Sequence, residues 1–399
     1  MVTYPKDWDE SKLLDHVTLV QGLTYTPENV KPTGTLVLRS SNIQNGRLSL
    51  EDNVYVNAFV PEEKMVAPRD ILVCVRNGSS ALIGKSCVLP ELKRTTFGAF
   101  MSILRGDTTG YFAKLFESNV VQEQVRGRSN ATINQITKKD FQSIMVTVPE
   151  KPEQKEIVDV LSSFDAYIDD LTELIEKKKG IRDGALEDLV SGKTRITGFS
   201  SEREEYSIND ITHAVITGGT PSTAREEYYG GDIPWLASTE IHQKRITKPT
   251  TYITELGLNN SSAKIAPENS VLIALAGQGK TRGTAAFLTK PMALNQSLAA
   301  LVTNEKCDPE FLYYLIESMY LPLRELSSGD GGRGGLNKKL IKGFLVKIPV
   351  DVNEQRAIAD TLLAMDEEIR DLEREREKII QIREGAMDDL LTGRVRLTT

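Results

Sequence analysis

The feature that most constrains this chain is a direct repeat of two of its segments. Residues 153–197 and 354–398 align without a gap at a shift of 201 positions, and 20 of the 45 aligned positions are identical. Such an alignment indicates the architecture before any local pattern is considered. The identical positions include Glu153/Glu354, Gln154/Gln355, Asp165/Asp366, Arg182/Arg383, Gly192/Gly393 and Arg195/Arg396.

The longer segments that precede the two copies repeat more faintly. Residues 38–43 correspond to residues 236–241, and the segments end on matching residues, Val148-Pro149 and Ile348-Pro349. A length of 399 residues also favours two or more domains. The sequence therefore predicts four parts: a globular unit at 1–150, a long helix at 151–199, a second globular unit at 200–350 and a second long helix at 351–399.

Both copies of the repeat carry apolar residues at alternating spacings of four and three. This 3.5-residue period is typical of a coiled coil, because it keeps one apolar stripe facing a partner helix. We expect the two helices to pair antiparallel about a pseudo-two-fold axis; the alternative is that each helix packs on its own globular unit. A helix from Glu153 to Val190 would be about 57 Å long, with Gly192 and Gly393 favouring helix ends. The predicted seam consists of Ile157, Leu161, Phe164, Ile168, Leu171, Ile175, Ile358, Leu362, Met365, Ile369 and Leu372.

Each globular unit is predicted to be mixed α/β. Short apolar runs, such as residues 35–38 and 71–75, have the length of strands and are separated by turn residues. Each unit is expected to close with one helix, at 110–124 and 309–326, followed by a last strand. Trp8 and Trp235 lie beside apolar residues, so we expect both in the cores.

The net charge of −7 argues at first against a nucleic-acid partner. The acidic excess, however, lies in the helical segments: residues 151–199 carry −3 and residues 351–399 carry −5. The globular segments are close to neutral, at +1 for residues 1–150 and 0 for residues 200–350. Their basic residues gather in glycine-containing loops, which leaves nucleic acid open as a partner.

The cysteine usage and the hydropathy pattern indicate a cytoplasmic protein. No apolar run approaches the length of a membrane span, and the first residues lack the basic-then-apolar order of a signal peptide. The three histidines are too scattered to suggest a metal site. A reducing compartment without structural zinc is expected because no CxxC pair occurs among Cys74, Cys87 and Cys307.

Residues 276–281 read AGQGKT, which resembles part of a phosphate-binding loop. The full pattern requires a glycine five positions before Gly279, and that position is Ala274. The segment after the loop leads into a second apolar run at 285–288 and does not open a helix. This order of strand, basic loop and strand predicts a β-hairpin. A nucleotide-binding enzyme built around residues 276–281 is the alternative.

In its duplicated layout the chain resembles the specificity (S) subunits of type I restriction–modification systems. Each long helix follows an apolar residue and a proline and begins near Glu-Gln, at 148–154 and 348–355. The helix ends LVSGKTRIT and LLTGRVRLT also fit, as do GGTPSTAREEYYGGDIPWLAS (218–238) and AGQGKTRG…LNQSL in the second unit. The first unit departs from this pattern, because Val20-Gln21-Gly22 stands in place of the GTP…IPW opening.

The resemblance implies two target-recognition domains, each of which reads one half of a split site in double-stranded DNA. It also implies an antiparallel coiled coil that docks modification (methyltransferase) subunits, expected to be two. Restriction (translocase and nuclease) subunits would join through the complex. No cofactor is expected in this chain; S-adenosylmethionine, and ATP with Mg, are expected on the partner subunits.

Four polar loops supply candidate DNA contacts. The predicted hairpin loop around 276–283 and its counterpart at 75–86 are joined by the loops at 126–134 and 327–337. Lysine and arginine can neutralise phosphates or reach guanine, and glutamine can pair with adenine. For each residue the alternative is a solvated surface side chain. The candidates are Arg76, Asn77, Lys85, Arg126, Arg128, Asn130, Gln278, Lys280, Arg282 and Arg333.

No catalytic site is predicted. The Asn-Pro-Pro-aromatic and Asp-Pro-Pro-aromatic strings of adenine methyltransferases do not occur in the sequence. A purely structural coiled-coil scaffold is a third hypothesis. It predicts featureless surfaces on the globular units, which the repeated basic loops argue against.

Overall fold

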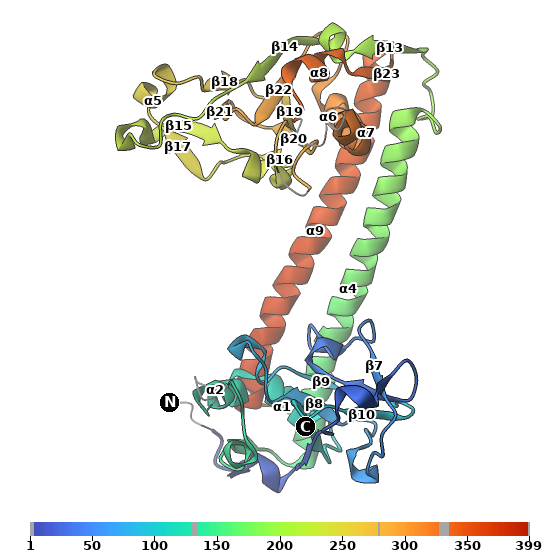
Figure 1. The fold of residues 1–399 in the computed structure, drawn as a ribbon, viewed down its shortest axis with the longest axis vertical. Helices are drawn as coiled ribbons and strands as arrows, with labels where there is room; N and C mark the ends of the chain where they lie inside the picture. The colour runs from blue at the N-terminus through green and yellow to red at the C-terminus, as the bar shows by residue number, and fades with distance from the viewer. Residues whose placement is uncertain (1–3, 129–133, 278–279, 327–334, 398–399) are drawn as a thin grey trace. The chain divides into compact units, whose positions relative to one another are not determined.

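The computed structural model describes residues 4–128, 134–277, 280–326 and 335–397. The chain forms two compact units: unit 1 consists of Met1–Thr172 and Arg374–Thr399, and unit 2 consists of Glu173–Glu373. Each unit contains one globular domain and parts of two long helices, α4 (Lys151–Ser191) and α9 (Val352–Leu391) (Figure 1). The two units thus share both long helices, α4 and α9.

The globular domain of unit 1 contains two four-stranded sheets and two short strand pairs. The first sheet has the order β2 (Thr18–Gln21), β11 (Met101–Arg105), β8 (Ile71–Cys74) and β9 (Ser86–Val88). The second sheet has the order β10 (Thr95–Phe97), β4 (Thr35–Leu38), β7 (Val54–Val56) and β3 (Val30–Lys31). The strand pairs are β1 (Asp9–Lys12) with β12 (Met145–Val148), and β5 (Ile43–Gln44) with β6 (Arg47–Leu48).

The globular domain of unit 2 repeats this plan. The first sheet has the order β14 (Thr212–Thr217), β22 (Leu298–Thr303), β19 (Ser270–Ala274), β20 (Ala285–Leu288) and β16 (Arg245–Ile246). The second sheet has the order β17 (Thr251–Ile253), β15 (Tyr229–Leu236), β21 (Met292–Leu294) and β18 (Lys264–Ala266). The strand pair is β13 (Arg203–Ser207) with β23 (Leu345–Pro349).

Matching strand pairs show that the two domains share one topology. In both second sheets one pair is parallel, β4 with β10 in unit 1 and β15 with β21 in unit 2. In both first sheets, β8 and β19 lie between two antiparallel neighbours. The prediction of two similar mixed α/β domains is therefore confirmed.

The central strand of each first sheet is apolar on both faces because each face covers a different core. Along β8, Ile71 and Val73 belong to the core that contains the helices, while Leu72 and Cys74 belong to the core between the two sheets. Along β19, Val271 and Leu272 divide in the same way. Successive side chains of a strand point to opposite faces, so a fully apolar run has the pattern of a buried strand.

The predicted closing helices are each interrupted, so the prediction of one continuous helix is wrong. Unit 1 has α1 (Tyr111–Glu117) and α2 (Asn119–Arg128), and unit 2 has α6 (Pro309–Ser318) and α7 (Tyr320–Leu326). Ser118 is extended at ψ 157°, and its hydroxyl donates to the Leu115 carbonyl at 2.6 Å. Such a local side-chain bond competes with helix continuation. Because α2 runs through Arg128, the loop predicted to begin at residue 126 begins later.

The long helices end as the sequence predicts. Gly192 and Gly393 have φ of 81° and 68°, the left-handed conformation that glycine adopts without strain. Along both helices the predicted seam is removed from solvent. The buried members are Ile157, Leu161, Leu171, Ile175, Ile358, Leu362 and Ile369, and the half-buried members are Phe164, Ile168, Met365 and Leu372.

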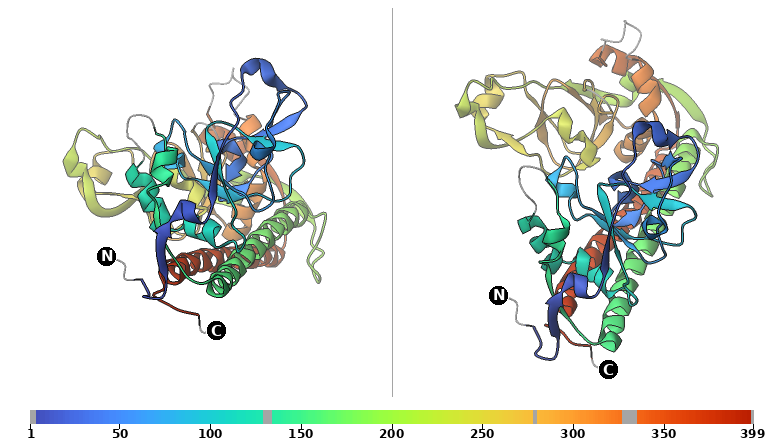
Figure 2. Two further views of the ribbon diagram at one scale, coloured as in Figure 1. Left: turned by 90° about the horizontal axis from the view of Figure 1, so that it is seen from below. Right: turned by 60° about the horizontal axis from the view of Figure 1, so that its bottom comes forward.

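Within each unit the start of one long helix packs against the end of the other. In unit 1, Ile157 and Leu161 of α4 share a hydrophobic core with Leu390 and Leu391 of α9. The two helices run side by side there in both views of Figure 2. The same core includes side chains of the globular domain, so these seam positions contact the partner helix end and their own domain together.

Ion pairs between identical positions of the repeat fix the antiparallel direction. In unit 1, Arg396 of the C-terminal segment pairs with Glu153 at 2.5 Å, and in unit 2 Arg195 pairs with Glu354 at 2.6 Å. Arg383 pairs with Asp165 at 2.7 Å, and Arg182 pairs with Asp366 at 2.8 Å. The predicted antiparallel helix pair with an internal repeat is confirmed.

Candidate nucleic-acid interface

A β-hairpin carries the basic glycine loop of unit 2. Strands β19 and β20 pair antiparallel, with Ile273 opposite Ala285, and the loop between them contains AGQGKTRG. In unit 1, β8 and β9 pair in the same way, with Val73 opposite Ser86. The predicted hairpins are confirmed. A phosphate-binding loop requires a strand followed by a helix, so the nucleotide-enzyme alternative is not supported.

In unit 1 the hairpin loop and the second predicted loop meet. The Asn77 backbone amide donates to the Asn134 carbonyl at 3.2 Å, and the Asn134 side chain donates to the Gly78 carbonyl at 3.0 Å. The Ile136 amide donates to the Val75 carbonyl at 2.9 Å. Two loops that lie about fifty residues apart in the sequence therefore form one edge of the domain.

Unit 2 has the corresponding edge. The Leu336 amide, near the end of the second polar loop, donates to the Leu275 carbonyl at 3.0 Å, and the Leu275 amide donates to the Ser297 carbonyl at 2.8 Å. On the other side of the hairpin loop, the Tyr320 hydroxyl donates to the Lys280 carbonyl at 3.0 Å. The His242 ring lies 3.2 Å from the Thr281 hydroxyl.

The candidate residues of unit 1 occupy different environments. Arg76 is exposed, and its guanidinium lies 5.0 Å from the centre of the Phe100 ring. Asn77 is held by its own domain, because its side chain donates to the Ser40 hydroxyl at 3.1 Å and accepts from the Ser79 amide. Lys85 is half-buried beside the start of β9. Arg76 is thus the best presented of the three for an external ligand.

The candidates from the second loop of unit 1 lie mainly on α2. Arg126 is exposed on the last turn of this helix. The guanidinium of Arg128 donates to the Ser143 hydroxyl and carbonyl and to the Gln124 carbonyl, at 2.7 to 2.9 Å. These bonds tie α2 to the segment before β12 and occupy three of the five N–H donors of the guanidinium. Asn130 lies outside the described residues.

In unit 2 the described candidates are Lys280 and Arg282. Lys280 is exposed, whereas Arg282 is half-buried next to α7. Gly283 has φ 82°, and a Cβ atom there would lie 3.2 Å from the Arg324 side chain, so glycine suits this close approach. Gln278 and Arg333 lie outside the described residues.

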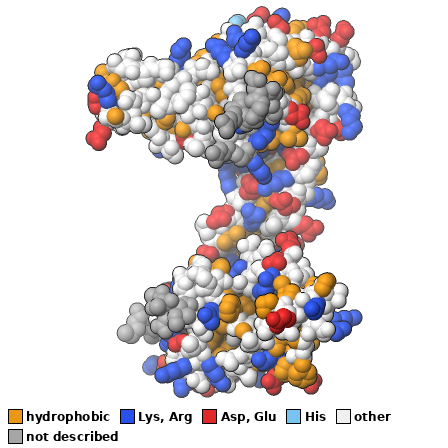
Figure 3. All heavy atoms as spheres, in the orientation of Figure 1, with side chains coloured by type: hydrophobic (Ala, Val, Ile, Leu, Met, Phe, Trp, Pro, Cys, Tyr) orange, Lys and Arg blue, Asp and Glu red, His pale blue; other side chains and the backbone are white. Residues whose placement is uncertain are grey.

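The same edges include residues that the sequence analysis did not single out. In unit 1 these are Ser40, which binds Asn77, and Phe100, which is 56% exposed. In unit 2 the Thr220 hydroxyl donates to the Gln296 side chain at 2.6 Å. Thr220 and Gln296 belong to the GGTP and LNQS strings, so the family resemblance offered a signal for them. Figure 3 shows hydrophobic and basic side chains intermixed on the visible face of unit 1 (lower body).

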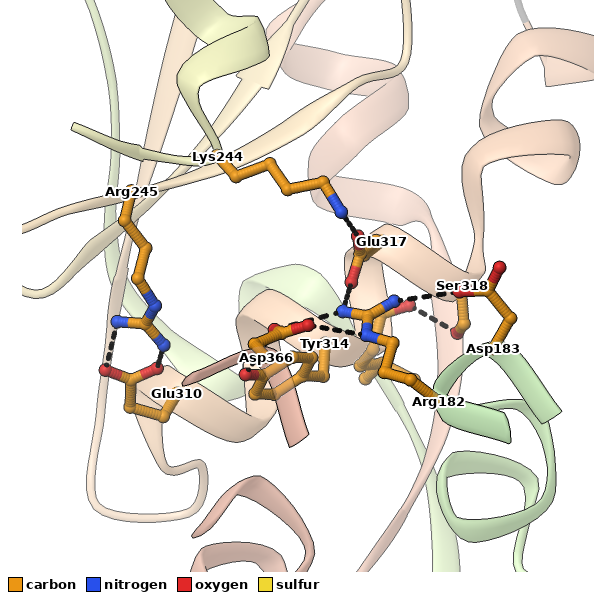
Figure 4. Close-up of polar contacts among 10 residues, drawn as sticks. Arg182, Asp183, Lys244, Arg245, Glu310, Tyr314, Glu317, Ser318 and Asp366 are labelled. Atoms are coloured by element: carbon orange, nitrogen blue, oxygen red, sulfur yellow. Dashed lines mark hydrogen bonds and ion pairs between the residues drawn. The ribbon is translucent and has the colours of Figure 1, made fainter. Parts of the chain in front are cut away.

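In unit 2 an ion-pair cluster joins the globular domain to the helix pair; we call it the helix joint of unit 2 (Figure 4). The Arg182 side chain, only 5% exposed, contacts Asp366 at 2.8 Å and Glu317 of α6 at 2.5 Å. The Tyr314 hydroxyl donates to Asp366 at 2.9 Å. Lys244, which precedes β16, reaches Glu317 at 3.0 Å. A groove of about 610 Å³ opens beside this cluster.

Burial and neighbouring charges both shift pKa values in this helix joint. Burial alone would lower the pKa of Arg182, but Glu317 and Asp366 raise it above its ordinary value. Burial, together with the Asp366 carboxylate, raises the pKa of Tyr314. Both groups therefore keep their protons at neutral pH, so Arg182 stays a cation beside Glu317 and Asp366, and Tyr314 stays a hydrogen-bond donor to Asp366.

The helix joint of unit 1 uses equivalent residues with one exchange. Arg383 contacts Asp165 at 2.7 Å and Glu117 of α1 at 3.1 Å. Lys114, which stands at the position of Tyr314, forms a second ion pair with Asp165. Asp165 thus receives cations from both α1 and α9, and Glu117 receives one from α9.

The described residues offer groups that bind and position, namely cations, amides and hydroxyls. Among them, no group of three or more His, Cys, Asp or Glu side chains is arranged to hold a metal ion. None of the helices in the described ranges has both the length and the apolar character needed to cross a membrane.

Known proteins share this arrangement. The EcoKI specificity subunit of Escherichia coli (strain K12) is 29% identical over 202 residues, which are 47% of this chain and 44% of that subunit. The HindI specificity subunit of Haemophilus influenzae is 22% identical over 88% of this chain and 84% of that subunit. The crystal structure of a type I S subunit from M. genitalium has the same fold, with a TM-score of 0.60, 16% identity and 96% coverage of both chains.

The two halves of the chain also match one family model separately. The model of the type I restriction modification DNA specificity domain matches residues 5–181 and again residues 200–382. Each match contains one globular domain with its two loops and most of the long helix that follows. Because the matches cover most of the sequence, the chain belongs to the family of type I restriction modification DNA specificity domains.

Proposed function

We propose that this chain is the specificity subunit of a type I restriction–modification complex and that each globular domain reads one half of a split DNA site. The observation that carries the proposal is the loop edge that recurs in both units. In each unit a hairpin loop and a second polar loop meet on the same topology. Two similar DNA-recognition domains on one chain suit a DNA site with two separate halves.

The chemistry of these edges suits duplex DNA. Arg76 and Lys280 are exposed on hairpin loops, where they can neutralise phosphates or reach guanine in the major groove. Glycines in both loops allow the backbone to approach the duplex. The remaining candidates also stay predictions: Asn77, Lys85, Arg126, Arg128 and Arg282, together with Asn130, Gln278 and Arg333, which lie outside the described residues.

The proposal extends to partners, cofactors and location. Two modification subunits dock on the helix pair, and restriction subunits join through the complex. The chain itself performs no chemistry, and S-adenosylmethionine, and ATP with Mg, belong to the partner subunits. The cysteines Cys74, Cys87 and Cys307 are buried and free, which suits the cytoplasm.

We also propose that the helices set the spacing between the half-sites. Two readers on one face of B-DNA need centres about 34–36 Å apart, or multiples of that distance. Removing a matched heptad from both helices, residues 170–176 and 372–378, would shorten each by about 10 Å. The spacer of the target should then shorten or binding should be lost, while the half-site sequences remain.

The test is to express the chain with its modification subunits and to map methylated bases across the host genome. The proposal expects a split motif, and exchange of residues 200–350 for another domain of this family should replace one half of it. Methylation without a split motif, or a change of both halves, would contradict the proposal.

The hairpin loop is tested through the salt dependence of binding to that site. Lys280→Ala should flatten the log–log salt slope by about one unit if the lysine contacts a phosphate. If it reads guanine, discrimination at one position should fall by about 1–3 kcal/mol. Lys290→Ala is the matched control, because Lys290 is exposed at the other end of β20. Equal behaviour of the two variants would remove the loop from the interface.

A further inference from the structure

A cavity of about 740 Å³ opens in unit 1 beside the hairpin loop 75–85. Two contacts join the cavity to that loop. Arg76 lies over the ring of Phe100, a lining residue, and Asn77 donates to the hydroxyl of Ser40, another lining residue. The cavity is therefore continuous with the proposed DNA-reading edge of this domain.

The walls of the cavity are aromatic and apolar, with hydroxyls among them. Tyr25 and Phe100 supply rings, Leu23 and Val30 supply apolar surface, and Thr24 and Ser40 supply hydroxyls. Phe100 is 56% exposed and Val30 is 42% exposed. Exposed apolar groups gathered next to polar ones indicate a binding surface.

The charge of the lining favours a neutral ligand. Its only ionised residues in the described chain are Arg39 and Asp52, which pair with each other at 2.7 Å. A phosphate would find apolar walls and a cation that is already neutralised. An aromatic, uncharged ring with a polar edge would satisfy both the rings and the hydroxyls.

We propose that this cavity takes a nucleobase that has left the stack of the half-site bound by unit 1. The inference rests on the proposed function and adds a ligand site to it. Side chains that read paired bases must project into a groove, whereas a base reaches a concave site on the protein only after it has left the duplex. Aromatic rings bind an unstacked base of any sequence through its π face.

The inference concerns unit 1 alone. The turn between β10 and β11 that carries Phe100 corresponds to residues 295–297 in unit 2, which read Asn-Gln-Ser. That turn holds the hydrogen bond between Gln296 and Thr220. Without an aromatic residue there, the second half-site should keep its bases stacked.

The test pairs protein variants with DNA that lacks single bases, using the chain together with its modification subunits. The half-site of unit 1 is identified as the half of the methylated motif that stays unchanged when residues 200–350 are exchanged for another domain. At one position of that half-site, removal of the base should weaken wild-type binding on the order of ten- to a hundredfold. Phe100→Leu and Tyr25→Leu should weaken binding to intact DNA, but removal of that base should then have little further effect.

Two comparisons sharpen this test. Phe59→Leu is the matched control, because Phe59 is 88% exposed in the same domain and does not line the cavity; it should leave the effect of base removal unchanged. A mismatch at the critical position should tighten wild-type binding, because an unpaired base leaves the stack at lower cost. Base removal across the half-site of unit 2 should show no dependence on Phe100.

The possible outcomes separate the inference from the proposed function. Failure of the wild-type complex to bind a split site contradicts the proposed function itself. Specific binding with additive effects of Phe100→Leu and base removal at every position overturns the cavity alone. Loss of modification-subunit association in Phe100→Leu, with no coupling to DNA, also overturns it and assigns the cavity to a protein partner.

Discussion

Units 1 and 2 fasten the globular domain to the helix pair with the same arginine and aspartate but with different second partners. In unit 1, Lys114 of α1 gives Asp165 a second cation. In unit 2 the equivalent residue is Tyr314, which gives Asp366 only a hydroxyl. The second cation of unit 2 is Lys244, which comes from the sheet domain and reaches Glu317.

This difference separates what the repeat retains from what can vary. The arginine and the aspartate link two long helices and a domain helix in both units, so this ion pair is the retained part of the helix joint. The second cation can come from another element, because it needs only to lie near one of the carboxylates. We therefore expect the helix joint of unit 2 to depend more strongly on its arginine.

The largest expected effect is that of Arg182→Met. It removes the cation next to Asp366 and Glu317. The free energy of unfolding of unit 2 should therefore fall by about 3–5 kcal/mol, the loss expected when a buried ion pair is broken. Arg383→Met should cost unit 1 less, roughly 1–3 kcal/mol, because Lys114 still neutralises Asp165. Urea unfolding of unit 2 is followed through Trp235 in a Trp8→Phe background, and unit 1 through Trp8 in a Trp235→Phe background. Equal losses in the two units would contradict the comparison.

A smaller effect, dependent on pH, is expected for Glu354→Gln. Burial alone would raise the pKa of Glu354, but bonds from Ser201 and Arg195 lower it below its ordinary value. Because the pKa is lower in the folded state, the carboxylate stabilises unit 2 above the ordinary glutamate pKa of about 4.3, and this contribution is lost as pH falls through the lowered value.

The measurement compares urea midpoints of the wild type and Glu354→Gln at pH 7, 5 and 3. The variant should be less stable than the wild type by about 2 kcal/mol at pH 7. This gap in stability between the two proteins should close toward pH 3. Glu153→Gln in unit 1 should show a smaller gap, since that side chain is 12% exposed and Glu354 is 1% exposed. A gap that stays constant with pH would show that the carboxylate charge is not responsible.

Tyr314→Phe should have a moderate effect on unit 2. The change removes one hydrogen bond to Asp366 and preserves the ring, so we expect a loss of about 1–1.5 kcal/mol. In unit 1, Lys114→Met should lower the free energy of unfolding by no more than Tyr314→Phe does in unit 2, because Arg383 still pairs with Asp165. The same tryptophan signals measure both variants. A loss for Tyr314→Phe as large as that of Arg182→Met would mean that the hydroxyl, rather than the arginine, holds Asp366.

The smallest effect is expected for Lys244→Ala. Its side chain is 60% exposed, and an exposed ion pair contributes about 0–1 kcal/mol that salt weakens further. Arg47→Ala provides the matched control in unit 1, because Arg47 is 59% exposed and pairs with Asp169 of α4. If Lys244→Ala destabilised unit 2 by several kcal/mol in high salt, the second cation would be essential.

The sequence predicted those parts of the fold that repeat or that have a simple period. The heptad spacing and the two near-identical copies indicated an antiparallel helix pair, and the apolar runs around the glycine loop indicated a hairpin. The breaks at Ser118 and Met319 were missed, because one extended or bent residue leaves the apolar pattern unchanged.

The candidate site was less predictable because its residues come from distant segments. Ser40 meets Asn77, and Phe100 meets Arg76, only after the two sheets have formed. Burial and local hydrogen bonds also decide which arginine and lysine side chains remain available for DNA contacts. Nothing in the local sequence distinguishes Arg128, which binds Ser143, from Arg76, which faces outward.

The division of the chain into units has a consequence for its synthesis. Unit 2 is one continuous stretch, but unit 1 needs residues 374–399, which the ribosome produces only after all of unit 2. At about 5–20 residues per second, these residues follow Thr172 by roughly 10–40 s. During that time Ile157 and Leu161 lack Leu390 and Leu391, and Asp165 lacks Arg383. The domain that is made first is therefore completed last.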